Sequence, residues 1–424
     1  MKLPSRIFAS AALVSSLLLA GHDVASAALL ADQPVFAASD VPGNLALALS
    51  VEYPTAISVA NLGDYADAVE YLGYFDPRKC YAYQLNTALP AQSFFISAAA
   101  ATGANRHQCN GTQWSGNFMN WATMQTIDPF RWALSGGFRS VDSETETILE
   151  KAWGSDQGSD SNFPRRGTSG GAGHNLPGTL VASVTPFAGT TFNTRVHARG
   201  NRMVFGTAGT AYDTNNSPPD YGAASPSGDT FQVYVRVKVC DKAAGGNIEA
   251  NCVKYGSNYK PEGLLQQYAN KIRYSTFAYL NAGGDTQQGA VMRAQMGFIG
   301  PTFPQPLSPT LTTNSRAEWR ADTGQMLDNP DAAMATDSGV TNSGVMNYLN
   351  KFGQAAKNYM TYDTVSELYY AVLRYFQNLD NATEWTTGLD ATKLDGFPAP
   401  TSWAGKDPIA YSCQKNFVLG VGDN

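Results

Sequence analysis

Residue patterns that could carry catalytic chemistry are sparse in this 424-residue sequence. It has no nucleophile elbow between a strand and a helix, no His-Glu-x-x-His zinc motif, no phosphate-binding P-loop and no glycine-rich dinucleotide turn after a strand. The histidines that follow the first 27 residues occupy polar or loop-like contexts without a partner at helical spacing: His107, His174 and His197. The sequence therefore predicts a protein without enzymatic activity.

A pair of carboxylates is another arrangement that does chemistry, because glycosidases use one carboxyl group as an acid and a second as a base or nucleophile. Asp142, Glu144 and Glu146 lie close together in the sequence. We expect a helix over residues 145–153, and acidic side chains near a helix start are favoured by the helix dipole. We therefore interpret these carboxylates as structural.

Aromatic side chains are densest between residues 114 and 153. Their rings could stack on sugars, or supply the rigid contact area that adhesive surfaces use. The same residues at helical spacing are also typical of a hydrophobic core. The cluster contains Trp114, Phe118, Trp121, Phe130 and Trp132, and we take the three tryptophans as candidate binding residues.

The first 27 residues are typical of a secretory signal peptide. Lys2 and Arg6 precede an apolar stretch at residues 7–20, and residues 25–27 read Ala-Ser-Ala, a small-x-small cleavage site. The apolar stretch is shorter than the ~20 residues of a membrane-spanning helix. We expect an exported chain over residues 28–424, without a transmembrane segment.

All five cysteines lie in the exported part, where disulfides are the expected state. Neighbouring cysteines would pair as Cys80–Cys109 and Cys240–Cys252, leaving Cys413 free or paired outside the chain, although the sequence does not determine the connectivity. A zinc site is the alternative. The sequence lacks the Cys-x-x-Cys pairs that zinc sites use, and His107 near Cys109 is too little to form a zinc site.

Composition excludes two further classes of protein. Hydrophobic residues make up 43% of the chain, too many for a disordered protein. Only 15% of residues are charged, and 29 basic against 35 acidic side chains leave a net charge of −6. Nucleic-acid binding depends on basic side chains at phosphates, so we expect no nucleic-acid partner.

The hydrophobic pattern predicts strands and helices in mixed order, typical of one α/β domain. Residues 154–178, which include Arg165 and Arg166, and residues 207–230 are rich in small polar residues, so we expect solvated insertions there. Residues 179–205 have strand character. We expect further strands at 45–50, 233–239, 272–280 and 417–421, and helices after Ser115, from Asp128 to Leu134, and at 262–269, 343–352 and 365–377.

Several strings resemble the N-terminal region of the PilY family, exported proteins of type IV pilus assembly and pilus-tip adhesion. The most specific are WSGNFMNWAT at 114–123, DPFRWAL at 128–134 and CQKNFVLGVGD at 413–423. Further matches lie at residues 71–76, 233–241, 261–266 and 366–370, so the resemblance covers most of the chain from Val41 to Asp423.

The resemblance implies a von Willebrand factor A-like (Rossmann-like) sheet with helices and long insertions over residues 28–424. In that family a β-propeller follows, and we expect this chain to lack it. The fold can hold a divalent cation with an Asp-x-Ser-x-Ser turn, a Thr and a distal Asp. Here the turn reads Ser-Val-Glu-Tyr-Pro, so the resemblance implies only a degenerate site, weak or absent, and no other cofactor. Its residues would be Ser50, Glu52, Thr364 and Asp423.

The function implied is that of an exported protein of pilus biogenesis and pilus-tip adhesion, located in the periplasm, the outer membrane or the pilus. It would act by protein–protein contacts with minor pilins and other tip components, and on host or abiotic surfaces. One alternative is an exported carbohydrate-binding or carbohydrate-active protein that uses the aromatic cluster. The other is an inactive, truncated remnant.

Overall fold

The computed structural model describes residues 41–154, 163, 165–196, 200–206, 230–242, 247–281, 289–305 and 310–422. The predicted signal peptide, His197 and Asp423 lie outside these ranges. Apart from Val41, the described residues belong to one compact unit. Within them, no helix has the length and apolarity needed to cross a membrane.

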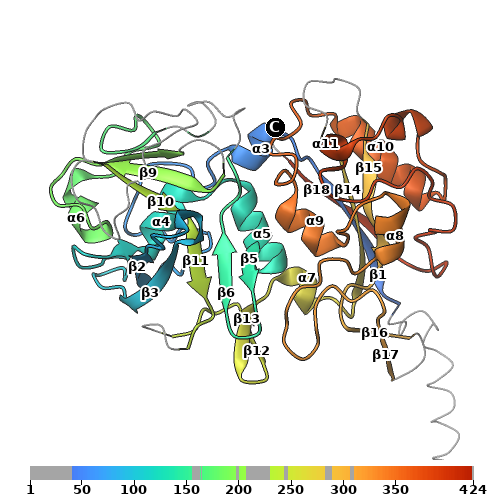
Figure 1. Cartoon of the computed structure of the whole chain (residues 1–424), viewed down its shortest axis with the longest axis horizontal. Coiled ribbons are helices and arrows are strands. Elements are labelled where there is room, and N and C mark those ends of the chain that lie inside the picture. Colours follow the sequence, from blue (N-terminus) through green and yellow to red (C-terminus); the bar gives the residue numbers. More distant parts are fainter. Residues whose placement is uncertain are drawn as a thin grey trace, which may run out of the picture. The chain divides into compact units, whose positions relative to one another are not determined.

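One four-stranded sheet has the first strand of the chain, β1 (Gly43–Leu49), at an inner position (Figure 1). Strand β1 pairs in parallel with β14 (Ile272–Ala278) and with β18 (Asn416–Val421), and β15 (Val291–Gly297) lies antiparallel to β14. The central strand is buried on both faces, which agrees with its continuous apolar run.

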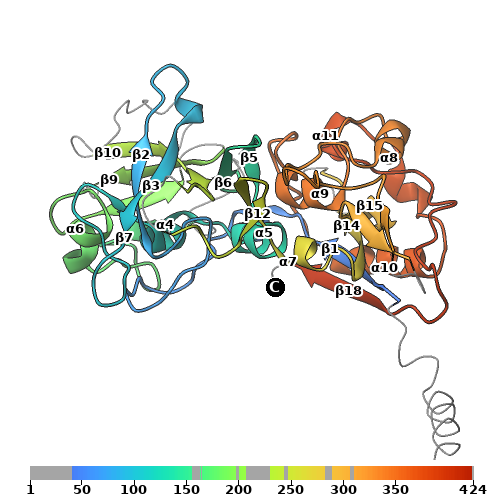
Figure 2. The same cartoon turned by 90° about the horizontal axis from the view of Figure 1, so that it is seen from below.

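Helices pack on both faces of this sheet. Helix α9 (Val345–Lys351) lies on one side and α10 (Val365–Phe376) on the other (Figure 2). Both helices were expected from their amphipathic patterns. Shorter elements complete this region: α3 (Tyr53–Ile57), α8 (Ala332–Asp337), α11 (Ala391–Leu394), the 3-10 helix η3 (Thr383–Thr386) and the hairpin of β16 (Thr302–Pro304) and β17 (Leu311–Thr313).

The residues between β1 and β14 fold into further sheets. One has the order β4-β2-β3-β11-β6-β5, another the order β10-β9-β8-β7, and β12 and β13 form a hairpin. Their bounds are β2 (Lys79–Gln84), β3 (Phe94–Ala100), β4 (Trp114–Ser115), β5 (Arg139–Asp142), β6 (Thr147–Glu150), β7 (Arg166–Gly167), β8 (Asn193–Val196), β9 (Arg202–Gly206), β10 (Thr230–Tyr234), β11 (Arg236–Val239), β12 (Cys252–Tyr255) and β13 (Asn258–Pro261).

Both helices expected after Ser115 and from Asp128 are present beside these sheets. The Ser115 hydroxyl caps α4 (Gly116–Thr123) by accepting from the Phe118 N–H at 3.3 Å. Helix α5 (Ile127–Ser135) ends at Gly136, whose φ of 83° and proximity to the Pro261 carbonyl leave no room for a side chain. Also present are α6 (Val181–Val184), α7 (Leu264–Gln267) and the 3-10 helices η1 (Pro90–Gln92) and η2 (Gly178–Leu180).

Three expectations from the sequence were wrong. Within residues 145–153, Thr147–Glu150 form strand β6 instead of a helix, because pairing with β5 and β11 buries both Ile148 and Leu149. Residues 179–205 begin with η2 and α6 before the strands β8 and β9. The third concerns Arg166, which is buried, not solvated. Its guanidinium donates to the Trp121 and Asn61 carbonyls and lies over the Trp121 ring.

The run of alternating valines also divides between two sheets. Val233 lies in β10 and Val237 in β11, and both are buried. Between them, the Val235 N–H donates to the Asn201 carbonyl, while the Val235 carbonyl accepts from the Lys151 N–H. The break at Val235 therefore lets one predicted strand serve both sheets.

Disulfides join Cys80 to Cys109 and Cys240 to Cys252, the neighbouring pairs expected from the sequence, and Cys413 is free and exposed. The loops span 29 and 12 residues. In the chain-entropy model we expect Cys80→Ala/Cys109→Ala to lower the free energy of unfolding by about 3.5 kcal/mol and Cys240→Ala/Cys252→Ala by about 3 kcal/mol. Urea unfolding without reductant measures this. Cys413→Ala is the control, and equal losses in all three variants would contradict the expectation.

Glu318 predicts a pH-dependent stability. Its two carboxylate oxygens accept from the Val345 and Met346 N–H groups at the start of α9, each at 2.7 Å, yet burial raises its pKa to about 7. This folded-state pKa lies above the unfolded value near 4.3. The contribution of Glu318 to the stability of the folded state is therefore fully present below about pH 4.3 and is lost as the pH rises to 7. The loss is of order 3 kcal/mol.

We therefore expect Glu318→Gln to flatten the fall in stability between pH 4.5 and 7, measured by urea unfolding across that range. Asp395 contributes in the same direction, since burial raises its pKa to about 6, so part of the slope remains. Replacing the exposed Glu144 with glutamine is the control and keeps the wild-type profile. A Glu318→Gln variant with an unchanged slope would refute the assignment.

Candidate functional site

Of the residues predicted to hold a cation, Ser50 lies at the carboxyl end of β1, where its partner is Asp363. The Ser50 hydroxyl donates to Asp363 Oδ1 at 3.0 Å, and the Tyr279 hydroxyl donates to the same oxygen at 2.5 Å. Burial and the neighbouring Asp363 raise the pKa of Tyr279, which keeps its phenol protonated. Thr364 follows directly in the chain, at the start of α10. Ser50 and Thr364 are therefore linked through Asp363.

Glu52 does not join this group. Both of its carboxylate oxygens accept from the Thr55 N–H, at 2.9 and 3.0 Å, so the side chain caps α3. Asp363 is the acidic residue beside Ser50, and its only sequence signal was its position before Thr364. One carboxylate and two hydroxyls are fewer oxygens than Mg²⁺ or Ca²⁺ takes. The described residues alone therefore do not fit a complete site for either cation.

Two of the three candidate binding tryptophans were assigned wrongly. Trp114 and Trp121 are buried with at most 1% of their surface exposed, so neither ring is available to a ligand. Trp114 packs against Phe205 with ring centres 4.8 Å apart, and the Trp121 indole N–H donates to the Gly63 carbonyl at 3.0 Å. Trp132, which is half-buried, lines a cleft.

This cleft has a volume of about 700 Å³ and combines apolar walls with a buried ion pair. Lys79 Nζ lies 2.7 Å from Glu249 Oε1 and 3.9 Å from Asp76 Oδ2. Burial raises the pKa of Asp76, and the nearby ammonium of Lys79 opposes that rise. The other carboxylate oxygen of Glu249 accepts from the Cys240 N–H at 2.8 Å, beside the Cys240–Cys252 disulfide. Apolar walls come from Phe75, Leu149, Val239 and Ile248.

The central charged groups of the cleft are paired with one another. Its lining contains no histidine, and the Lys79 amine is paired. Cys240, Glu249 and Cys252 form the only cluster of at least three potential His, Cys or carboxylate metal ligands within the described ranges, but the disulfide removes both thiolates. The geometry fits a ligand that offers an apolar group to the walls and a polar group to the ion pair.

Among the remaining candidates for chemistry, His107 and Ser169 have hydrogen-bond partners, whereas Nδ1 of His174 has none among the described residues. His107 is buried, with Nδ1 2.6 Å from the Asp67 carbonyl oxygen. His174 is half-buried, and burial lowers its pKa. Residues 167–171 spell Gly-x-Ser-x-Gly, but a turn follows β7 there, and the Ser169 hydroxyl donates to Asn193 Oδ1. A nucleophile elbow needs a strand-to-helix turn and a histidine partner.

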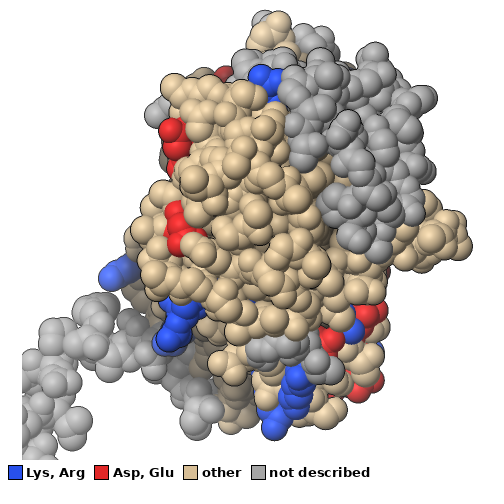
Figure 3. Space-filling model, turned by 90° about the vertical axis from the view of Figure 1, so that its left-hand side faces the viewer, with Lys and Arg blue, Asp and Glu red and all other residues tan. Residues whose placement is uncertain are grey.

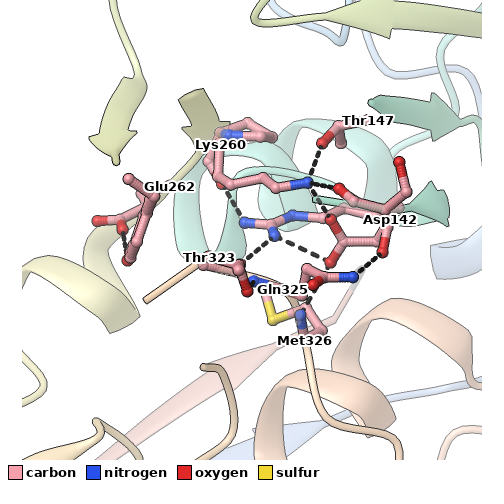
Figure 4. A network of polar contacts seen from close by, with 12 residues as sticks. Asp142, Thr147, Lys260, Glu262, Thr323, Gln325 and Met326 are labelled. Carbon is pink, nitrogen blue, oxygen red and sulfur yellow. Dashed lines mark hydrogen bonds and ion pairs between the residues drawn. The ribbon is translucent and has the colours of Figure 1, made fainter. Parts of the chain in front are cut away.

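Asp142 is the centre of a buried polar network (Figure 4). Lys260, whose side chain is fully buried, donates to Asp142 Oδ1 at 2.8 Å and to Thr147 Oγ1 at 3.0 Å. Arg139 donates to Asp142 Oδ2 at 3.1 Å, and the same oxygen accepts from the Met326 N–H at 2.8 Å. Asp142 therefore joins β5, β13 and residues 323–326, which is a structural role, and it lies in β5 instead of at a helix start.

Comparisons with known proteins place the chain. Residues 63–204 match the family model described as the PilY1 homolog small alpha/beta domain. Over 422 aligned residues, 93% of this chain, the sequence is 43% identical to a type IV pilus biogenesis factor PilY1 homolog of Xylella fastidiosa strain Temecula1. The chain is related to the PilY1 homologs. A second PilY1 homolog of the same strain is 29% identical over 238 residues, 51% of the chain.

The chain spans 33% of the first relative and 15% of the second. The range matched by the family model runs from before β2 into β9 and includes Trp132 and the part of the cleft wall at residues 70–79. It therefore covers the first of the two predicted insertions, residues 154–178, but not the second, residues 207–230. No solved structure matches the chain.

Proposed function

We propose that this chain acts in type IV pilus biogenesis as an exported, non-enzymatic protein that works by contacts with other proteins. The observation that carries the proposal is the 43% identity, over 93% of the chain, to a protein named as a pilus biogenesis factor. Both disulfides suit export to an oxidising space. The face of the molecule in Figure 3 presents few charged side chains, which suits a surface that binds proteins.

Within this proposal the cleft with Trp132 is one contact site, and its partner is a minor pilin or another pilus-tip component. Aromatic side chains in partly buried pockets dominate many protein interfaces. Export to the periplasm, the outer membrane or the pilus, and adhesion to host or abiotic surfaces, belong to the same proposal.

Gene deletion and complementation test the proposal. We expect deletion to reduce surface pili and the wild-type gene to restore them, and normal piliation after deletion would refute the role. Trp132→Ala should reduce both complementation and co-purification with minor pilins. Phe130→Ala is the matched control, since Phe130 is exposed on the same helix and does not line the cleft. Equal behaviour of the two variants would remove the cleft from the proposal.

We also infer that the β15-β14-β1-β18 sheet is of the von Willebrand factor A type. Its support is the central first strand with parallel neighbours on both sides and an antiparallel edge strand. A divalent cation could contact Ser50, Asp363 and Thr364 at the carboxyl end of β1, where open α/β sheets bind ligands.

Because those residues offer few ligands, we expect 5 mM Mg²⁺ or Ca²⁺ to leave the thermal midpoint unchanged relative to EDTA. A tightly bound ion must raise stability by mass action. A rise with either cation that Asp363→Asn abolishes would contradict the expectation and assign a functional site. The carbohydrate alternative loses support, since Trp114 and Trp121 are buried.

A further inference from the structure

Strand β18 leaves one edge of its sheet open (Figure 2). It pairs with β1 on one side, and the sheet order places no strand of the described residues on the other. The Asn44 N–H donates to the Lys415 carbonyl and the Ser50 N–H to the Val421 carbonyl, so the odd-numbered residues bond to β1. Alternation along a strand then directs the N–H and C=O groups of Asn416, Val418 and Gly420 away from β1.

The residues of β18 itself lack the charged side chains and proline that often protect an open edge. Edge strands are normally blunted by charged side chains, proline or a covering element, because unpaired backbone groups recruit other strands. Strand β18 reads Asn-Phe-Val-Leu-Gly-Val, with no charge and no proline. Phe417 and Leu419 are 55% and 40% exposed on one face of the sheet. In composition, this edge strand therefore resembles an interior strand.

The opposite face of the sheet carries a second exposed apolar surface beside the same edge. Tyr369 of α10 lies over Gly420, so close that a Cβ at this glycine would collide with the tyrosine hydroxyl oxygen. Val365 and Leu373, one helical turn to either side of Tyr369, are exposed as well. Apolar surface on both faces of an open edge fits a strand that is itself apolar on both sides, as interior strands of parallel sheets are.

We propose that β18 is the docking edge for one further apolar β-strand, supplied by polypeptide of the kind that the longer PilY1 homologs contain beyond the matched region. Backbone hydrogen bonds to Asn416, Val418 and Gly420 give affinity, and the apolar residues on the two faces select the strand. The relative that is 43% identical has about three times the length covered by the match, so that relative contains such polypeptide outside the matched region. The proposal does not depend on the pilus role.

The test uses the full chain and, as a probe, the part of that Xylella fastidiosa relative outside the matched region, produced as a separate polypeptide. We expect a complex in which the Val418 and Gly420 amides exchange hydrogen at least tenfold more slowly than in the free chain. Phe417→Lys and Leu419→Lys should each weaken binding at least tenfold. Leu62→Lys, at an apolar residue 77% exposed elsewhere, should change it less than twofold.

Four results would overturn the proposal. The first is the absence of a complex, and the second is a complex whose affinity neither lysine variant changes. The third is that the amides of residues 418 and 420 are already protected from exchange in the free chain. The fourth is that the free chain forms dimers and that either variant dissociates them. The third would mean that another segment of this chain closes the edge, and the fourth that a second copy does. Both substituted side chains are exposed, so the variants should fold, and exchange in the wild type tests the edge without them.

Discussion

Replacing Asp142 with alanine is expected to lower the free energy of unfolding by about 3–5 kcal/mol, because removal of one partner leaves a buried charge uncompensated. The fully buried ammonium of Lys260 would lose its carboxylate, and Arg139 would lose the same partner. The Met326 N–H would lose its acceptor. The effect should be large because one carboxylate serves segments far apart in the sequence.

Urea unfolding followed by tryptophan fluorescence measures this loss. Asp328→Ala is the matched control, since it also removes an aspartate paired with a lysine, but the Asp328 side chain is 79% exposed. Exposed pairs contribute about 0–1 kcal/mol. Similar losses for Asp142→Ala and Asp328→Ala would show that the network is not a centre of stability.

Trp121→Ala is expected to cost about 3–5 kcal/mol, the range for truncating a buried aromatic residue. Its ring packs edge-on against Tyr65 at 5.5 Å and supports the buried guanidinium of Arg166 at 4.6 Å. The substitution therefore opens a cavity and removes the cation–π contact of a buried charge.

Trp132→Ala provides the contrast, since this half-buried ring borders a cleft and its loss should change stability far less. The two variants separate a core residue from a binding residue of the same type, by urea unfolding and by glycan-array binding. Glycan binding by the wild type that Trp121→Ala abolishes without loss of stability would restore the carbohydrate hypothesis.

Elements with strong local signals were predictable. The apolar run of β1, the amphipathic pattern of α10 and the Ser115 cap of α4 each depend on residues close together in the chain. Residues 145–153 carried a weaker pattern, compatible with a helix. Their strand conformation depends on β11, about 90 residues later, and partners so distant leave no local signal.

The candidate site was predictable only in part. Ser50 and Thr364 were expected together on family grounds, and Asp363 links them across 313 positions. Glu52 was expected with them, but its carboxylate accepts a hydrogen bond from the Thr55 N–H, three residues away. The donor that a carboxylate binds depends on the geometry of the folded backbone around it, and residue type alone does not specify that donor.

The sequence by itself determined the class of this protein: low in charge, with a predicted signal for export, neighbouring cysteines, a mixed order of strands and helices, and strings that resemble the PilY family. The tertiary structure decided which of the candidate binding and charged residues face solvent. Burial made Trp114, Trp121 and Arg166 parts of the core and left Trp132 at a cleft. The physical reason is that burial depends on long-range packing, whereas composition and spacing report only what each segment could bury.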